Sequence, residues 1–269
     1  MNDQLKNNFM SDNKTDQEQV NQTEQLFLSD DLVFYTIEGE GEFIGQPSVF
    51  MRMSMCNLTC IGFASEDSPN GCDSYISWSI KNKMTFAAIF EMMEKNGHID
   101  HLRSNAILKL TGGEPIIQEK QLLKFIESFK HKYGFIPRID FETNATIKPS
   151  PRWTKDFNAT FTTSPKLISN GDPEKKTYKP EVLRWHVDNG SSFKFVINSD
   201  TDIEEIWKKY VFDYDGINIP LDRIWFMPCC GSREEHIKNA PAVAEYAKAL
   251  NVNFSPRLQL LIWDKALKV

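Results

Sequence analysis

Apolar and polar positions alternate with two distinct periods along the chain from residue 26 onward. Phe86, Ile89, Phe90 and Met93 recur at the spacing of one helix face, whereas short apolar runs such as residues 106–110 are typical of strands. We expect helices over residues 86–93, 122–133, 180–187, 202–210 and 241–250, and an irregular loop over residues 60–78. We expect strands over residues 31–37, 49–53, 106–110, 138–141, 159–162, 192–197, 223–226 and 252–262.

Strands that alternate with helices predict an α/β fold with right-handed crossovers and a mainly parallel sheet. Such a sheet is either open and doubly wound or a full or partial barrel, and in each case the chemistry sits at the carboxyl ends of the strands. Polar loops at residues 111–114, 142–144, 163–166 and 227–228 each follow a predicted strand. We therefore expect these loops to meet at one site.

Composition separates a tail from the rest of the chain. Residues 1–25 offer almost nothing to bury and predict a flexible polar tail, which leaves residues 26–269 as one domain. The net charge of −6 argues against a nucleic-acid partner, although a few arginines could still hold a small anion. No apolar run reaches the roughly 20 residues that span a bilayer, and no signal-peptide core is visible. We expect a cytoplasmic protein with no membrane partner.

The five cysteines occur in two clusters, which does not fit a secreted disulfide framework. Cys56, Cys60 and Cys72 follow the strand predicted at residues 49–53. Three thiolates there could hold a metal centre and leave one coordination position open. Burial as small apolar side chains is the alternative, and it is the interpretation that we favour for Cys229 and Cys230.

A Gly-Gly-Glu-Pro sequence, residues 112–115, follows the strand at 106–110. Two glycines at the end of a strand let the backbone approach a ligand closely. Glu114 would then offer a carboxylate to an ammonium group or a ribose hydroxyl. The alternative is a tight turn that carries a solvated glutamate.

Three cysteines on a loop after a strand, followed by Gly-Gly-Glu-Pro, resemble the radical S-adenosylmethionine enzymes. Within that superfamily the chain resembles the 7-carboxy-7-deazaguanine synthase (QueE) family from about residue 34 onward. The segments that carry the resemblance are residues 38–41, 45–52, 56–60, 72–74, 111–115, 142–144, 164–166, 194–196 and 255–258.

The resemblance implies a partial, open TIM-type barrel and a carbon–nitrogen lyase of queuosine and 7-deazapurine biosynthesis. Such an enzyme converts 6-carboxy-5,6,7,8-tetrahydropterin into 7-carboxy-7-deazaguanine with loss of ammonia. It uses a [4Fe–4S] cluster, S-adenosylmethionine and Mg²⁺, and the cofactor carries the difficult chemistry. A flavodoxin-like or other electron donor and a homodimer are implied as well.

The family's functional residues map onto this chain one by one. The cluster ligands would be Cys56, Cys60 and Cys72, and Ser74 would contact Mg²⁺. The S-adenosylmethionine site would comprise Gly71, Cys72, Asp73, Gly113, Glu114, Glu142, Ser164, Pro165, Lys166, Met227, Pro228, Cys229 and Cys230. The pterin would contact Ile37, Glu38, Gly39, Glu40, Arg52, Thr111 and the terminal carboxylate of Val269. The planar fork of the Arg52 guanidinium suits the substrate carboxylate, and Glu38 and Glu40 offer acceptors to the ring N–H groups.

Four positions depart from the family pattern. Eleven residues separate Cys60 from Cys72, where the family usually has a close spacing, and Glu38 stands where glutamine is common. Ser74 replaces the usual threonine, and the family's histidine near the C-terminus is replaced near Trp263. The extra carboxylate at Glu38 makes the predicted pocket more negative.

Two other functions fit part of the pattern. An activating enzyme for a glycyl-radical partner would share the three cysteines, but the turn at residues 38–41, Arg52 and Ser74 argue against it. A zinc-stabilised binding module would use Cys56, Cys60, Cys72 and Cys229. Zinc would leave the protein colourless, whereas an iron–sulfur cluster would colour it brown.

Overall fold

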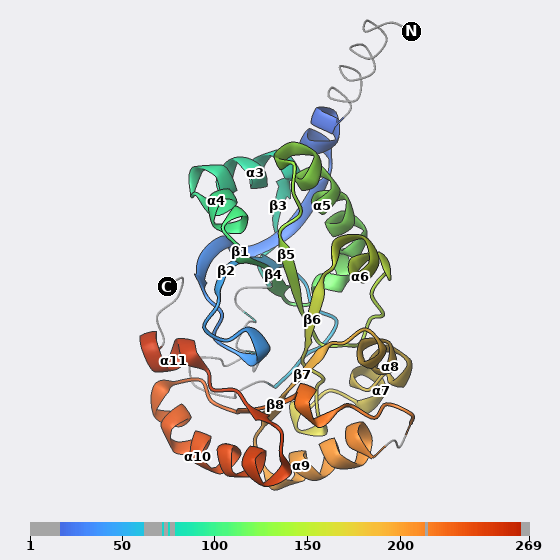
Figure 1. Ribbon diagram of the computed structural model, residues 1–269, viewed down its shortest axis with the longest axis vertical. Coiled ribbons are helices and arrows are strands. Elements are labelled where there is room, and N and C mark those ends of the chain that lie inside the picture. Colours follow the sequence, from blue (N-terminus) through green and yellow to red (C-terminus); the bar gives the residue numbers. More distant parts are fainter. Residues whose placement is uncertain (1–16, 62–71, 73–74, 76–78, 213–214, 265–269) are drawn as a thin grey trace, which may run out of the picture.

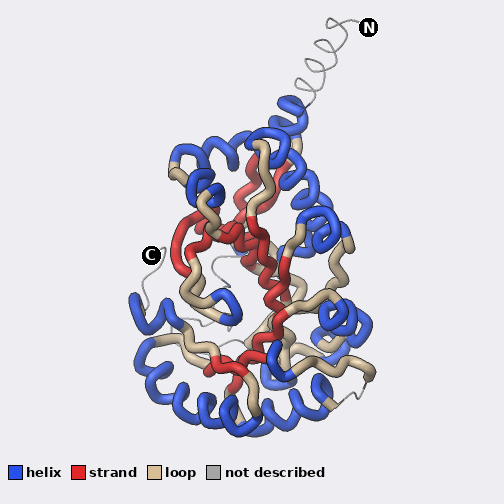
Figure 2. The backbone as a smooth tube through the Cα atoms, in the orientation of Figure 1, coloured by secondary structure: helices blue, strands red, loops and turns tan. Residues whose placement is uncertain are grey.

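The computed structural model describes residues 17–61, 72, 75, 79–212 and 215–264 of the 269-residue chain. One curved sheet organises the molecule, with strand order β3-β1-β2-β4-β5-β6-β7-β8-β9. The helices lie along its outer face, and the inner face curves around an interior that the sheet does not close (Figure 1, Figure 2). This arrangement confirms the expected α/β partial barrel.

The strands are parallel except at one edge. The strands from β2 through β9, other than β3, run parallel to one another, and β1 is antiparallel to both β2 and β3. Their bounds are β1 Gln25–Ile37, β2 Pro47–Met53, β3 Asn82–Thr85, β4 Ile107–Gly112, β5 Arg138–Thr143, β6 Thr160–Thr163, β7 Ser192–Ile197, β8 Ile224–Pro228 and β9 Asn253–Phe254.

Helices connect the successive parallel strands, as crossover connections require. Their bounds are α3 Phe86–Lys95, α4 His98–Arg103, α5 Glu119–Tyr133, α6 Arg152–Phe157, α7 Glu174–Thr177, α8 Pro180–Asp188, α9 Asp200–Ile206, α10 Arg233–Leu250 and α11 Leu258–Trp263. Helix α3 begins where the Thr85 side chain accepts a hydrogen bond from the Ala88 N–H, and α5 ends at Gly134, whose φ is +76°. A π-helical stretch, Trp207–Val211, continues α9.

Two hydrophobic clusters fill the space between the sheet and the helices. The first packs α3 and α5 on β1, β2, β4 and β5, with Phe90 stacked on Phe125. The second packs α8, α9 and α10 on β7 and β8 around Phe195 and Tyr210. The apolar side of each strand therefore faces the helices, and the other side is left for the interior.

Three expectations need correction. Regular structure begins before residue 26, because residues 17–23 are helical and β1 starts at Gln25, while residues 1–16 lie outside the description. Gln17 donates to the Ser128 hydroxyl at 2.6 Å, which ties this helix to α5. The segment at 252–262 is not one strand: β9 has two residues, and helix α11 begins at Leu258, two residues after Pro256. Strand β3 and helices α4, α6 and α7 were not expected, and most of the loop at 60–78 lies outside the described residues.

The connection between β1 and β2 folds back into the interior of the barrel, where Figure 1 shows it as a blue loop. Its short helix, Gly41–Phe43, begins at a glycine with a φ of +67°. The Gly41 N–H donates to the Ser255 hydroxyl at 2.7 Å, and the Leu258 N–H donates to the Gly39 carbonyl at 2.9 Å. These bonds join the start of the barrel to its last segment across the open side.

Candidate active site

The strand register gathers charged side chains on the inner face of the sheet. Successive side chains of a strand point to opposite faces, and Met51, Leu110 and Phe141 belong to the cluster beneath the helices. Their neighbours in sequence therefore face the interior. These inward-facing polar residues are Arg52, Lys109, Thr111, Asp140, Glu142, Thr162 and Lys194.

Lys109 forms the deeper ion cluster. Its Nζ lies 2.7 Å from Glu38 Oε2 and 2.7 Å from Asp140 Oδ2, and all three side chains are buried. Asp140 also accepts hydrogen bonds from the hydroxyls of Thr160 and Thr162. Burial raises the pKa of Glu38, although the adjacent ammonium of Lys109 opposes this. Glu38 is thus buried against Lys109 at the floor of the barrel, and its effect on the charge of the pocket stays a prediction.

Lys194 forms the second cluster by bridging Glu40 and Glu142. Glu40 also accepts from Arg257 Nε at 2.8 Å and from Gln259 Nε2 at 2.7 Å. Burial alone would raise the pKa of Glu142, but the ammonium of Lys194 outweighs it and holds that pKa at about 2. Glu40 and Glu142 are therefore ionised carboxylates at neutral pH.

Four of these charged residues received no role from the sequence: Lys109, Asp140, Lys194 and Arg257. A signal was present, because Lys109, Asp140 and Lys194 each interrupt an apolar strand. A charge is rarely buried in a strand without a partner.

Arg52 and Thr111 are register partners on β2 and β4, and Thr111 donates to Glu142 Oε2 at 2.9 Å. The predicted substrate contacts Arg52, Thr111, Glu38 and Glu40 thus lie around one interior. The Arg52 guanidinium lies 5.6 Å from the Phe34 ring centroid.

The cysteine-bearing segment leaves β2 beside the glycine turn that follows β4. The N–H groups of Gly113 and Glu114 donate to the carbonyls of Met53 and Met55 at 3.0 and 2.9 Å. A Cβ at Gly112 would lie 2.2 Å from the Met53 oxygen, and one at Gly113 would lie 1.9 Å from the Met55 oxygen. The glycines therefore admit the backbone that carries the cysteines.

Glu114 is fully buried, so the alternative of a solvated glutamate in a tight turn is wrong. Its carboxylate accepts from the N–H of Ile116 at 3.1 Å, the hydroxyl of Thr143 at 2.8 Å and the N–H of Asn144 at 2.8 Å. Burial raises its pKa to about 7. Glu114 joins the glycine turn to the loop after β5, and its contact with a ligand stays a prediction.

The loop after β5 also holds the cysteine segment. Asn57 donates to the Thr146 hydroxyl at 2.8 Å and accepts from Asn144 Nδ2 at 2.9 Å. Lys166, from the loop after β6, donates to the Ser164 hydroxyl at 3.0 Å. Loops from β2, β4, β5 and β6 thus converge at the carboxyl edge of the sheet.

Two of the three predicted cluster ligands lie together at this edge. Burial, with a smaller contribution from the nearby Cys60, raises the pKa of the Cys56 thiol to about 11. Thiol donors next to a glycine-lined backbone fit a soft metal centre such as an iron–sulfur cluster. Among the described residues, no three His, Cys, Asp or Glu side chains form a metal-binding group as they stand. The assignment of Cys56, Cys60 and Cys72 as cluster ligands therefore stays a prediction.

Gly71, Asp73, Ser74 and Val269 lie outside the described residues. Met227 and Pro228 end β8, and the Cys229 N–H donates to the Ile197 carbonyl at 3.0 Å. Cys230 is buried, as packing would require, and burial raises its pKa to about 12. Its carbonyl accepts from Arg257 Nη1 at 2.5 Å, which connects this segment to the interior charges. Whether residues 227–230 cover an adenosine stays a prediction.

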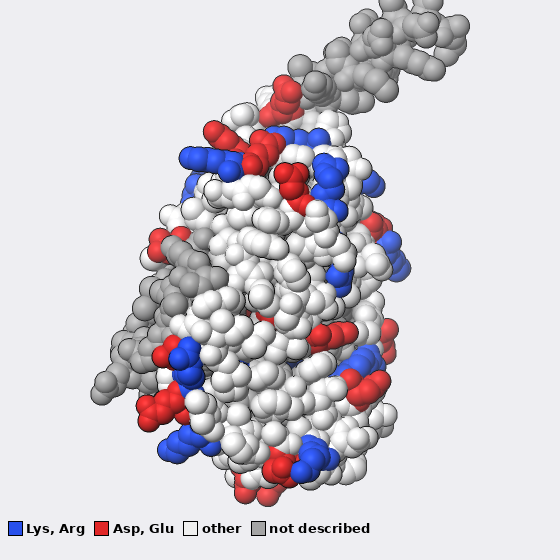
Figure 3. Space-filling model, turned by 60° about the vertical axis from the view of Figure 1, so that its left-hand side comes forward, with Lys and Arg blue, Asp and Glu red and all other residues white. Residues whose placement is uncertain are grey.

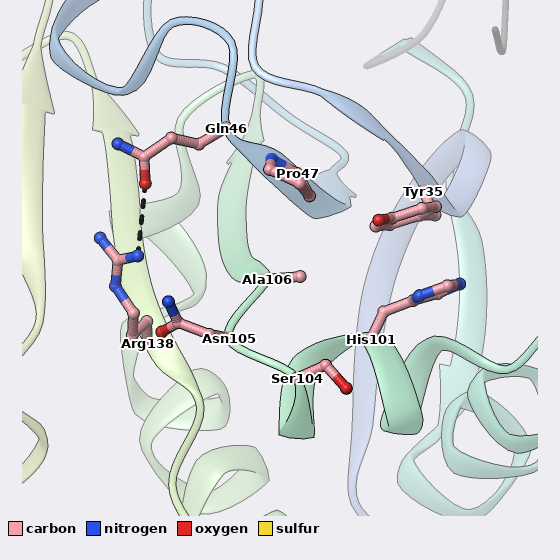
Figure 4. A pocket seen from close by; sticks show the side chains of 8 residues that line it. All are labelled: Tyr35, Gln46, Pro47, His101, Ser104, Asn105, Ala106 and Arg138. Atoms are coloured by element: carbon pink, nitrogen blue, oxygen red, sulfur yellow. Dashed lines mark hydrogen bonds between the residues drawn. The ribbon is translucent and has the colours of Figure 1, made fainter.

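A hollow of about 350 Å³ lies at the opposite end of the strands (Figure 4). Gln46 and Pro47 at the start of β2 line it together with Arg138 at the start of β5, and Tyr35 stacks on His101 at 3.8 Å between ring centroids. Since ligands of such sheets bind at the carboxyl ends, this hollow is not the predicted site.

The face of the molecule in Figure 3 does not separate its charges. On the face in Figure 3, lysines and arginines lie beside aspartates and glutamates, with no extended basic patch among the described residues there. Within the described part of the chain, every helix is too short or too polar to cross a bilayer.

Known proteins that share one name are similar to this chain over most of its length. No family model matches the chain. It is 28% identical over 244 residues to the 7-carboxy-7-deazaguanine synthase of Pyrobaculum aerophilum, covering 87% of this chain and 94% of the relative. It is 28% identical over 233 residues to the protein of the same name from Hyperthermus butylicus, covering 86% and 90%.

The crystal structure of QueE from Escherichia coli superposes with a TM-score of 0.57 at 21% identity, over 87% of this chain and 94% of that one. At this identity the match shows a shared fold. The two relatives match along almost their whole length, so 7-carboxy-7-deazaguanine synthases are the proteins to which this chain is similar.

Proposed function

We propose that this protein is a 7-carboxy-7-deazaguanine synthase, which converts 6-carboxy-5,6,7,8-tetrahydropterin into 7-carboxy-7-deazaguanine and ammonia. The observation that carries the proposal is the similarity to relatives of that name over 87% of the chain. The position of the cysteine segment supports it, because Cys56 and Cys60 follow β2 at the carboxyl edge while Arg52, on β2 itself, faces the interior.

Cys56, Cys60 and Cys72 would hold a [4Fe–4S] cluster. The cluster would supply the electron that cleaves S-adenosylmethionine to a radical. Lys166 and Ser164 lie at the same edge, where an ammonium and a hydroxyl can orient a carboxylate or ribose. Mg²⁺ at Ser74, a flavodoxin-like electron donor and a homodimer belong to the same proposal.

The interior residues would bind and orient the pterin. Arg52 would offer a guanidinium to the substrate carboxylate. Thr111 is its register partner on β4, and Thr111 in turn donates to Glu142. Glu40 is held by Lys194, Arg257 and Gln259. This preorganisation fixes its acceptor oxygens before the substrate arrives. Glu38 and the backbone of Gly39 would complete the recognition of the ring N–H groups.

The test is anaerobic incubation with S-adenosylmethionine, reductant, Mg²⁺ and the carboxylated tetrahydropterin, with the product identified by mass. Wild-type protein should be brown and form the deazaguanine. Cys72→Ala should lose both iron and product. Arg52→Ala should keep its iron and lower kcat/KM at least about tenfold, since a charge-assisted hydrogen bond is lost.

Arg103→Ala is the matched control, because Arg103 also packs on a phenylalanine, Phe135, but on the outer α4. It should turn over like the wild type. A colourless, zinc-containing wild type would refute the proposal. Normal turnover by Arg52→Ala would refute the substrate assignment alone.

A further inference from the structure

The segment that follows β6 runs beside the cysteine segment and is bonded to it. Asp172 is buried, with 6% of its surface exposed. Its Oδ2 accepts from the Thr59 N–H at 2.8 Å, and its Oδ1 accepts from the Thr59 hydroxyl at 2.8 Å. Both oxygens of one carboxylate thus bind one residue, which lies directly before Cys60.

The residue after Cys60 is held by the same segment. The Ile61 N–H donates to the Asn170 carbonyl at 2.9 Å, and Asn170 Oδ1 accepts from the Asp172 N–H at 3.1 Å. Gly171, with a φ of +89°, packs so closely that a Cβ there would lie 2.8 Å from Ile61 Cγ2. The backbone on both sides of Cys60 is therefore fixed against residues 170–172.

This arrangement bears on the long interval in the cysteine motif. Eleven residues separate Cys60 from Cys72, so Cys72 places little restraint on Cys60 through the chain. An outside anchor has to set the direction of the Cys60 side chain. We propose that Asp172 is the positioning residue that holds Cys60 ready for the cluster, an inference that rests on the proposed function.

The anchor also connects the two halves of the predicted site. Asp172 lies on the same segment as Ser164 and Lys166, and the Ser164 N–H donates to the Thr143 carbonyl at 2.7 Å, at the end of β5. A displacement of residues 59–61 would therefore change the position of a thiol relative to the loop that is predicted to contact S-adenosylmethionine.

The first test uses cluster-free protein and does not depend on activity. Hydrogen exchange of residues 57–61 should be at least about tenfold faster in Asp172→Ala than in the wild type, because hydrogen bonds to a carboxylate are lost. Asp172→Asn keeps an oxygen that can accept from the Thr59 N–H and should lie between the two. Unchanged exchange in Asp172→Ala would overturn the proposal.

Asp202→Ala is the matched control. Asp202 is as deeply buried and accepts from the N–H groups of Asn198 and Ser199, at the start of α9. Its loss should destabilise the fold without accelerating exchange at residues 57–61. Equal acceleration in both variants would show a general loss of stability and would contradict a specific role for Asp172.

The second test measures release of iron to a chelator from the anaerobically reconstituted protein. Release should be several-fold faster from Asp172→Ala than from Asp202→Ala or the wild type, and the electron paramagnetic resonance signal of the reduced cluster should broaden. Equal release rates would overturn the positioning role. A wild type that takes up no iron would instead refute the proposed function, while the exchange result would still decide whether the anchor exists.

Discussion

At the scale of single residues, Lys194 is the centre of the interior. Only 4% of its side chain is exposed, and it bridges Glu40 and Glu142, whose side chains are 14% and 30% exposed. A buried carboxylate that loses its cation is much more costly than an exposed one, because water cannot replace the partner. The lysine therefore matters both for the fold and for the charge that a substrate meets.

Lys194→Met should lower the free energy of unfolding by about 3–5 kcal/mol, since it leaves two carboxylates without their shared partner. Lys248→Met is the control, because Lys248 pairs with Glu245 where both side chains are exposed, at 73% and 70%. That change should cost about 0–1 kcal/mol. Urea denaturation followed by circular dichroism measures both, and equal losses would contradict the importance of the interior bridge.

At the scale of elements, the end of β4 and the segment after β2 form one unit. The glycine turn accepts no side chain because the backbone of Met53 and Met55 occupies the space, and Glu114 then fixes the turn to the loop after β5. Three consecutive strand ends are thereby held in register at the edge where the cysteines lie. The geometry of this edge depends on backbone contacts more than on side-chain packing.

Gly113→Ala should destabilise the protein by about 3 kcal/mol or more, because the new methyl group overlaps the Met55 carbonyl and the backbone has to shift. Gly134→Ala is the control. Gly134 has a φ of +76° and no atom within 4 Å of the position that a methyl group would take, so only the left-handed conformation is penalised. That penalty is about 1 kcal/mol. Thermal unfolding of both variants tests this, and a smaller loss for Gly113→Ala would exclude the close approach as its cause.

At the scale of the whole molecule, the open side of the barrel is joined by charge and by backbone. Glu40 on the inserted turn pairs with Arg257 on the last segment, and Arg257 also binds the Cys230 carbonyl. The interior is thus enclosed by residues from both ends of the described chain. Its many ionisable groups make the stability of the molecule depend on pH.

Two carboxyl groups should change that stability in opposite directions. Glu142 has a lowered pKa of about 2, so its contribution is present above about pH 4.5 and is lost as pH falls toward 2. Glu114 has a raised pKa of about 7, so its contribution is present below about pH 4.5 and is lost as pH rises toward 7. Glu142→Gln should flatten the acid limb of the unfolding free energy, and Glu114→Gln should flatten the slope between about pH 4.5 and 7. If each variant keeps the wild-type slope in its own window, the assignment fails. Denaturant titrations of cluster-free protein across this range provide the measurement.

Much of the fold follows from local pattern, whereas the site depends on distant pairings. The spacing of Phe86, Ile89, Phe90 and Met93 predicts α3 correctly because one helix face packs on the core. The apolar run at 258–263 resembles a strand but forms α11, since Pro256 breaks the extended segment just before it. Cys56, Glu114 and Arg52 could be chosen from motifs. Their partners could not, because Arg257 lies 217 residues from Glu40 and nothing local records that contact.

The inserted turn has a consequence for the order in which the molecule matures. Glu40 leaves the ribosome early, but Gln259, one of its partners, is made 219 residues later. Loop closure over such a separation is slow, and partly folded chains of this kind expose sticky surfaces. The helices and parallel strands can form during synthesis, while Glu40 has to wait for Arg257 and Gln259. Assembly of this protein therefore finishes at the predicted site.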